Sequence, residues 1–156
     1  MEAFHLKPGQ DTWIHLSLKS NAPHRITAIH IQLSSPAKMT DLAHAVSANS
    51  SGCLSITDRE TGYENSGVVA YWYQITLTFC YNGMDITALT TPRVSSWTNV
   101  FYGIYNYGAQ SYNQGTFGWG QGGFNECYLG CLQQSDGYVE IDVYGYGGYS
   151  AWRDVH

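Results

Sequence analysis

Hydrophobic and polar residues alternate along two stretches near the start of the chain, Thr12–Lys19 and Arg25–Ser34. Successive side chains of a β-strand point to opposite faces, so a period of two predicts a strand in each stretch. The residues between them, 20–24, are mostly turn formers, which favours a β-hairpin with a short loop. After the hairpin, residues Lys38–Ala48 carry apolar side chains at spacings that fit a short helix.

From residue 51 onward the chain consists of short alternating segments that turn residues separate. In one of them every second residue from Tyr71 to Phe79 is hydrophobic, and we expect this set to face a core. The Asn82-Gly83 pair that follows predicts a type I′ turn. The expected strands are Gly52–Thr57, Val68–Tyr81, Met84–Thr91, Val100–Tyr107, Thr116–Trp119, Phe124–Leu132 and Tyr138–Tyr144.

The last of these segments has one apolar face, with Val139, Ile141 and Val143, and one polar or aromatic face. Such a strand suits an antiparallel sheet that is wetted on one side. The whole pattern predicts an all-β fold, an antiparallel β-sandwich whose topology, jelly-roll or immunoglobulin-like, stays open. We expect residues 49–156 to form this domain and residues 1–48 to form an N-terminal β-hairpin extension, docked on its own sandwich or on a partner.

Aromatic residues and glycines are concentrated in the second half of the chain. The 56 residues from Trp97 to Trp152 contain 15 aromatic residues and 12 glycines, with four carboxylates and no Lys, Arg or His. Within this tract, Gly108–Gly123 is so rich in glycine and polar residues that we expect a long surface loop or an edge strand, not a central strand. Surface loops that expose aromatic rings are typical of binding sites.

Low charge narrows the classes of partner. Charged residues make up 12% of the chain, about half of the roughly 25% that is usual, and the net charge is −5 with seven Lys and Arg. Nucleic-acid binding needs a basic patch, so we expect no nucleic-acid partner. No apolar run approaches the roughly 20 residues of a membrane span, and no signal-peptide pattern is visible before the first expected strand.

The four cysteines, Cys53, Cys80, Cys127 and Cys131, are an even number in a chain that is poor in charge. This usage predicts two disulfides formed in an oxidising compartment, and the sequence leaves all three pairings open. Paired Cys-x2-Cys knuckles, which a zinc ribbon needs, are absent from the sequence.

Five landmarks follow one another from residue 52 onward. They are Gly52-Cys53, Phe79-Cys80-Tyr81-Asn82-Gly83, Gly123-Phe124 with Cys127, then Cys131, and finally Tyr138 to Ser150. In this order they resemble a family of small secreted, disulfide-containing β-domains that is common in actinobacteria. The resemblance covers residues 52–150 and implies export and disulfides, but no particular activity, because most members have no assigned function. Residues 1–48 have no counterpart in that pattern.

Aromatic and amide side chains occur together in and near the Gly108–Gly123 segment. Rings can pack on the apolar faces of sugars while amides bond to their hydroxyls. The candidate ligand-binding residues are Tyr112, Asn113, Phe117, Trp119, Gln121 and Tyr146. We therefore predict a non-catalytic extracellular module that binds a glycan or cell-surface polysaccharide.

The alternative function is a structural or adaptor subunit of an extracellular assembly, a filament or a particle, which includes homo-oligomers. Aromatic residues dominate the contacts of protein interfaces, and the N-terminal hairpin could pair with the sheet edge of another subunit. Both functions use the same Tyr/Gly-rich surface, so the sequence does not separate them.

Groups for catalysis or metal binding are few. Glu140 and Asp142 share a strand face and could form a carboxylate pair for glycoside hydrolysis, although such pairs ordinarily only make a sheet soluble. No Gly-x-Ser-x-Gly elbow occurs, so nothing indicates a serine hydrolase. We predict that the protein is not an enzyme and needs no cofactor.

Two further groups of polar residues suggest a metal at first sight. The run Thr57–Gly67 contains Asp58, Glu60 and Glu64, but its spacing fits no EF-hand, and we expect a solvated loop. His15 and His30 could meet across the hairpin, yet no third ligand is in view. We therefore predict no metal site.

Overall fold

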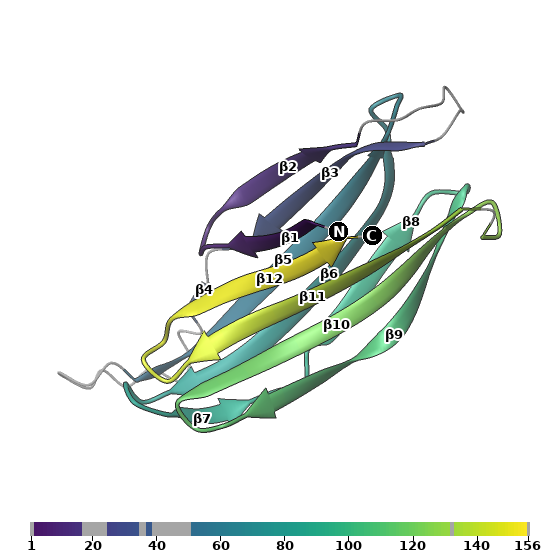
Figure 1. The fold of residues 1–156 in the computed structure, drawn as a ribbon. Helices are drawn as coiled ribbons and strands as arrows, with labels where there is room; N and C mark the ends of the chain where they lie inside the picture. The colour runs from purple at the N-terminus through teal and green to yellow at the C-terminus, as the bar shows by residue number, and fades with distance from the viewer. Residues whose placement is uncertain (1, 17–24, 35–36, 39–50, 132, 156) are drawn as a thin grey trace.

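The protein is a β-sandwich. In a computed structural model of the chain, which describes residues 2–16, 25–34, 37–38, 51–131 and 133–155, two antiparallel sheets pack face to face (Figure 1). Sheet A contains, from edge to edge, β1 (Glu2–Leu6), β12 (Tyr149–Val155), β11 (Gln133–Tyr144), β10 (Phe117–Tyr128) and β9 (Tyr102–Asn113). Sheet B contains β2 (Asp11–His15), β3 (Ile26–Leu33), β5 (Gly52–Glu64), β6 (Val69–Tyr81) and β7 (Ile86–Leu89), with β4 (Ala37–Lys38) beside β5 and β8 (Arg93–Thr98) beside β6. The predicted all-β sandwich is confirmed.

Most neighbouring strands are consecutive in the chain, and the exceptions among the described strands are β1 with β12, β3 with β5 and β6 with β8. Strands β9 to β12 form an up-and-down meander in sheet A, and β5 and β6 pair as neighbours in sheet B. The last strand, β12, pairs with the first, β1, so the two ends of the chain lie side by side (Figure 1).

The core lies between the sheets, where the alternation of the sequence placed it. In β6, Tyr71, Tyr73, Ile75, Leu77 and Phe79 are all buried. In β11 the three apolar residues at 139, 141 and 143 are fully buried, while the residues between them are partly exposed. Both strand predictions are confirmed, since the inward face of each is the apolar one.

The described part of residues 1–48 contributes to both sheets. The predicted hairpin is present, because β2 and β3 pair antiparallel, with Trp13 opposite His30. Leu6 and three residues of β3, namely Ile29, Ile31 and Leu33, are buried in the common core. This segment thus docks on its own sandwich. The predicted helix lies outside the described residues, apart from Lys38 at the end of β4.

The Gly108–Gly123 segment was predicted to be a loop or an edge strand, and this holds only for its first part, residues 108–113, which lies in the edge strand β9. Its second part lies in β10, which pairs with β9 on one side and β11 on the other. Glycines 118, 120 and 122 all point inward, where a Cβ at Gly120 would lie 2.6 Å from Leu77 Cδ1 and one at Gly122 would lie 2.6 Å from the Tyr73 hydroxyl. The strand is glycine-rich because sheet B approaches it closely, not because it is irregular.

The Asn82-Gly83 turn joins β6 to β7 as expected, but it is not of type I′. A type I′ turn needs positive φ at both central residues, and here Gly83 has a φ of 95° whereas Asn82 is not among the positive-φ residues. The Asn82 side chain instead accepts hydrogen bonds from the backbone N–H groups of Met84 and Asp85, at 3.0 and 2.8 Å. The asparagine therefore stabilises the turn through its amide oxygen.

The run Thr57–Gly67 was predicted to be a solvated loop, and this prediction was wrong. Most of it belongs to β5, and Asp58 and Glu60 point into the core, where both are fully buried. The Arg153 guanidinium, from β12, donates to both carboxylates. Tyr71 donates from its hydroxyl to Glu60. Buried charges are tolerated only when they are paired and hydrogen-bonded, and this group, the Arg153 cluster, meets that condition.

A further carboxyl, that of Glu126 on β10, is buried near this cluster. Burial and then the Glu60 carboxylate raise its pKa to about 8. Both causes disfavour the charged form. Glu126 is therefore mostly protonated at neutral pH, which keeps the count of buried negative charges low.

The four cysteines form two disulfides, which resolves the pairing. Cys53 and Cys80 lie directly opposite each other on β5 and β6, with Cα atoms 4.0 Å apart. Cys127 and Cys131 close the turn after β10. The residues between them include Leu129 and Gly130, both with positive φ.

Candidate functional site

The outer face of sheet A carries a continuous field of aromatic rings. On β10 the side chains that alternate with the inward glycines, Phe117, Trp119 and Gln121, point away from the core. The neighbouring strands place further rings beside these, since Trp119 lies directly opposite Tyr112 of β9 and Phe117 lies directly opposite Tyr144 of β11. We call this surface the aromatic face, made of Gln110, Tyr112, Phe117, Trp119, Gln121, Tyr138, Glu140, Asp142, Tyr144, Tyr146 and Trp152.

The rings of the aromatic face contact one another in pairs. The centroids of Tyr112 and Trp119 are 5.9 Å apart, and those of Phe117 and Tyr144 are 5.5 Å apart. Tyr146, in the turn between β11 and β12, stacks on Tyr144 at 5.4 Å with an angle of 17° between the planes. Contacts at these distances hold each ring in place, so the face is a preorganised surface and not a set of independent side chains.

A groove crosses this face between two tyrosines. Its volume is about 370 Å³, its sides are formed by Tyr107 and Tyr138, and its floor includes Gly122 and Gly123. A Cβ at Gly123 would lie 3.5 Å from Tyr107 Cδ2, so any side chain at this position would enter the groove. Glycine therefore keeps the groove open in the middle of a sheet.

Hydrogen-bonding groups line the groove beside the rings. Gln110 and Gln121 lie opposite each other on β9 and β10. The Tyr138 hydroxyl lies within hydrogen-bond distance of Gln121 Oε1 and of Glu140 Oε2, the latter at 2.9 Å. Burial and then the neighbouring Glu140 carboxylate raise the pKa of Tyr138, so its hydroxyl keeps its proton and remains a donor at neutral pH.

Two carboxyls extend the polar strip along β11. Asp142 lies opposite Trp119 on one side and Ser150 on the other, and Glu140 lies opposite Gln121 and Trp152. Burial, followed by the charge of Glu140, raises the pKa of Asp142 to about 6. Its Oδ1 atom is buried without a hydrogen-bond partner among the described residues. The strip thus offers acceptors and, below about pH 6, a donor to the hydroxyls of a ligand.

Five of the six predicted ligand-binding residues lie on the aromatic face. Tyr112 and Tyr146 are the most exposed of them, at 50% and 64%. Asn113 is the exception, because it follows Tyr112 and points to the other side of β9, where its side chain donates to the Ile86 carbonyl oxygen at 3.3 Å and accepts from Gly115 N at 2.9 Å. Its amide is used to hold the turn between β9 and β10.

The groove between Tyr107 and Tyr138 was not predicted from the sequence. Tyr107, Gln110 and Tyr138 were assigned to strands or to the loop without a binding role, although they form much of the groove. The signal was present as the period of two in residues 117–123, which places large residues on one face and glycines on the other. The glycine content concealed it.

The described residues hold no group of three or more His, Cys, Asp or Glu side chains arranged for a metal ion. His30 does not face His15 in the hairpin register, since Trp13 is opposite His30 and Ala28 is opposite His15. The His30 ring instead stacks on Trp13 at 4.2 Å, and its Nε2 lies 3.3 Å from Asp11 Oδ2. The two histidines, which the sequence allowed to meet across the hairpin, are therefore not opposite each other.

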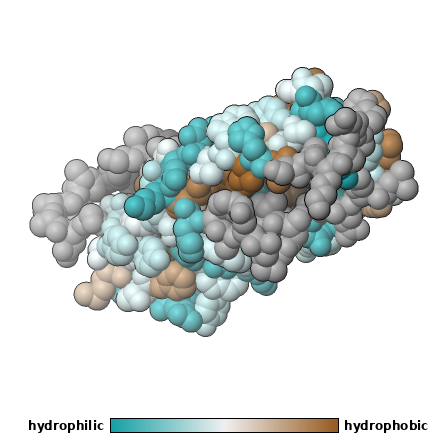
Figure 2. Space-filling model, turned by 45° about the horizontal axis from the view of Figure 1, so that its top comes forward, coloured by the Kyte–Doolittle hydropathy of each residue, from teal (hydrophilic) through white to brown (hydrophobic). Residues whose placement is uncertain are grey.

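The surface in Figure 2 shows residues of intermediate hydropathy beside hydrophilic and hydrophobic patches. In the view of Figure 2, much of the described part of the molecule has pale colours, which mark residues that are neither strongly hydrophilic nor strongly hydrophobic.

Among the described residues, no helix has the length and apolar character that crossing a bilayer requires.

Comparisons of the chain with protein-family models, with curated proteins and with solved structures found no match. Function is therefore inferred from the geometry of the molecule.

Proposed function

We propose that this protein is a non-catalytic, extracellular binding module that holds a glycan chain on the aromatic face of sheet A. The observation that carries the proposal is the combination of contacting rings with a groove whose polar groups are amides, a tyrosine hydroxyl and carboxyls. Sugars present apolar ring faces and many hydroxyls, and this mixture of aromatic surface with a few placed polar groups is complementary to both.

The charge of the face narrows the class of glycan. The aromatic face contains Glu140 and Asp142, and no Lys or Arg occurs between Trp97 and Trp152. A carboxylate- or sulfate-bearing chain would be repelled there, because like charges that are brought together without counterions cost free energy. The expected ligand of this site is a neutral polysaccharide.

The compartment belongs to the same proposal. Two disulfides are typical of proteins from oxidising environments, and the resemblance to secreted β-domains points the same way. We infer that the protein works outside the cytoplasm, at a cell surface or in the extracellular medium.

The test is a glycan array followed by retention on the polysaccharides that the array identifies. We expect the wild-type protein to bind a neutral glycan and Trp119→Ala to lose that binding. Trp97→Ala is the matched control, because Trp97 is 47% exposed on β8 of the other sheet. The bound polysaccharide should be recovered without new reducing ends, since chain cleavage would contradict a non-catalytic role.

Size measurement separates this proposal from an assembly subunit. A monomer that is retained on polysaccharide supports glycan binding and rules out an obligate assembly. Filaments or defined oligomers that ignore every neutral glycan, and that Trp119→Ala disperses, would contradict the proposal and assign the aromatic face to subunit contacts instead.

A further inference from the structure

The outer face of sheet B differs in chemistry from the aromatic face. Two rows of side chains cross it from strand to strand, as the register shows. In one row Arg59 of β5, Gln74 of β6 and Ser95 of β8 lie side by side, and in the next row the neighbours are Thr57, Thr76 and Arg93. We call this surface the arginine face, made of those six residues.

Two recesses lie on the arginine face and share one residue. The first, of about 350 Å³, is lined by Gln32, Arg59 and Gln74 together with Asp11 and neighbouring residues. The second, of about 260 Å³, is lined by Gln74, Thr76, Arg93, Val94 and Ser95. Gln74 forms part of both, so the two recesses are adjacent, and we call the strip that they occupy across β5, β6 and β8 the path.

The two arginines are the unusual feature of this path. Arg153 is buried with its carboxylates, whereas Arg59 is only partly buried and Arg93 is exposed. Within the described part of the chain, neither Arg59 nor Arg93 has a hydrogen bond or ion pair. The Arg59 guanidinium lies over the Trp72 ring, 4.6 Å from its centroid, and this contact restricts the guanidinium without neutralising its charge.

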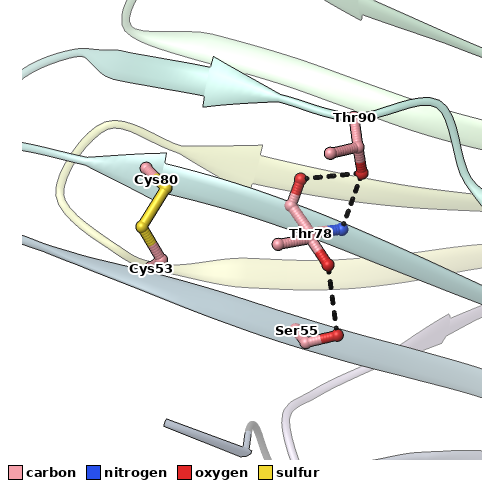
Figure 3. Close-up of a disulfide and its surroundings, with 5 residues drawn as sticks. All are labelled: Cys53, Ser55, Thr78, Cys80 and Thr90. Carbon is pink, nitrogen blue, oxygen red and sulfur yellow. Dashed lines mark hydrogen bonds between the residues drawn. A yellow bond between two sulfur atoms is a disulfide. The ribbon is translucent and has the colours of Figure 1, made fainter. Parts of the chain in front are cut away.

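Hydroxyl side chains joined by hydrogen bonds lie beside the arginines on β5 and β6. The Thr57 and Thr76 hydroxyls are 3.0 Å apart, and the next row continues with Thr78, which donates to Ser55 at 3.2 Å and is linked to Thr90. Figure 3 shows this row beside the Cys53–Cys80 disulfide, which joins β5 and β6 on the same face. The pairing of β5 with β6, which positions Arg59, is thus fixed by a covalent bond and by side-chain hydrogen bonds, while the pairing of β8 with β6 positions Arg93.

We propose that the arginine face is a second binding site, for an anionic glycan that carries carboxylate or sulfate groups, with Arg59 and Arg93 as its two anion contacts. A guanidinium binds either group through two parallel hydrogen bonds. Strand spacing places the Cα atoms of the two arginines roughly 12 Å apart, a separation that successive charged units of one polysaccharide chain can span. The site is independent of the aromatic face and goes beyond the function proposed for it.

Other charged groups near the path set its limits. Asp11 lies at the far end of the first recess, where His30 approaches it at 3.3 Å, so the positive stretch runs from Arg59 toward Arg93 and not toward β2. Two cations are too few for the tight phosphate neutralisation of a nucleic-acid site. They suit a chain whose anionic groups are widely spaced.

The experiment uses two anionic polymers and their neutral counterparts: dextran sulfate with dextran, and polygalacturonate with its methyl ester. We expect binding of at least one anionic polymer, weakened by salt, and no binding of its neutral counterpart at this site. Arg59→Gln and Arg93→Gln should each weaken that binding by about tenfold or more, and the double variant should abolish it. The two polymers distinguish sulfate from carboxylate recognition.

Three controls keep the outcome interpretable. Lys7→Gln removes the same unit of charge from the exposed turn before β2 and should leave binding unchanged. Arg59→Lys keeps the charge but loses the planar fork, and should bind with intermediate affinity. Trp119→Ala, on the opposite sheet, should bind the anionic polymer like the wild type, which shows that failure of one site does not imply failure of the other.

Results of two kinds would overturn the second site, failure of the binding test and self-association. One is wild-type protein that binds neither anionic polymer at low salt, or a folded double variant that binds as well as the wild type. The other is wild-type protein that self-associates at low salt through contacts that the double variant loses, without anionic-polymer binding, because the arginines would then pair with carboxylates of a second copy.

Discussion

The two faces of sheet A consist of the same strands but meet opposite requirements. Inward positions carry glycines, apolar residues and Arg153, and they have almost no freedom, since even a Cβ at Gly120 would collide with Leu77. Outward positions carry large rings that are partly exposed, such as Trp119 and Tyr146. Adjacent residues of β10 therefore have different roles: one packs against sheet B and the next lies on the aromatic face.

This difference between the two faces indicates why the aromatic face, and not the inner face, is the candidate for a binding function. Burial explains an inward ring such as Phe124, which stacks on Tyr73 at 4.3 Å inside the core. Burial does not explain Tyr112 or Tyr146, which are at least half exposed. Changes on the inner face should therefore alter stability, and changes on the outer face should alter binding.

The largest loss of stability is expected from Arg153→Met on the inner face. This change leaves Asp58 and Glu60 buried without their cation, and breaking one side of a buried ion pair costs about 3–5 kcal/mol. Chemical denaturation that follows Trp fluorescence measures the free energy of unfolding. The triple variant Asp58→Leu, Glu60→Leu, Arg153→Met should recover part of the loss, and an unchanged midpoint for the single variant would mean that the carboxylates are not buried as ions.

Glu126 gives the next largest effect, which depends on pH. Its pKa rises from an ordinary 4.5 to about 8 in the folded chain, so between these values only the folded state keeps the proton. The contribution of Glu126 to stability is therefore fully present below about pH 4.5. As the pH rises from there to about 8, this contribution is lost, and the free energy of unfolding should fall by a few kcal/mol.

Glu126→Gln removes this titration and should flatten the pH dependence. Asp142 contributes in the same direction, but only up to about pH 6, so the two proteins are compared between pH 6 and 8. Denaturation curves at several pH values provide the measurement. Parallel slopes for wild type and variant in that range would show that Glu126 is not a buried acid.

A matched pair of glycines compares the two sides of β10 most closely. Gly120→Ala places a methyl group 2.6 Å from Leu77 Cδ1 and 2.8 Å from Pro92 Cγ, and overpacking of this kind costs about 1–3 kcal/mol. Gly123→Ala meets only an ordinary contact, 3.5 Å from Tyr107, and should change stability by less than about 0.5 kcal/mol.

The same pair should behave oppositely in binding. Gly123→Ala narrows the groove and should weaken retention on the neutral glycan, whereas folded Gly120→Ala should keep it. Thermal denaturation and polysaccharide retention of both variants give the comparison. If Gly123→Ala bound like the wild type, the groove would not be part of the site.

The sequence predicted those parts of the fold where alternation was plain. Strands β6 and β11 were predicted with their inward faces, because every second residue is apolar in each. The two ends of β10 were predicted as separate strands, but its middle, residues 120–123, was missed because sequence preference counts glycine against a strand. The reason for glycine lies in Leu77 and Tyr73 of the other sheet.

The Arg153 cluster was beyond the sequence for a similar reason. Asp58 and Glu60 continue the inward alternation of β5, yet two carboxylates in a row of polar residues favour a solvated loop unless a partner is known. That partner is 93 residues away from Glu60. Exposed rings could be predicted from local composition, but their neighbours across the strands and the groove between Tyr107 and Tyr138 depend on register, which only the folded sheet defines.

The most direct test of glycan binding is a calorimetric titration of wild type, Trp119→Ala and Trp97→Ala with the neutral glycan that the array identifies. The two variants should lose less than about 1 kcal/mol of stability, since neither residue belongs to the core. We predict that Trp119→Ala weakens the affinity by about tenfold or more, while Trp97→Ala matches the wild type. Equal affinities for all three proteins, with all three folded, would contradict the assignment of the aromatic face as the binding site.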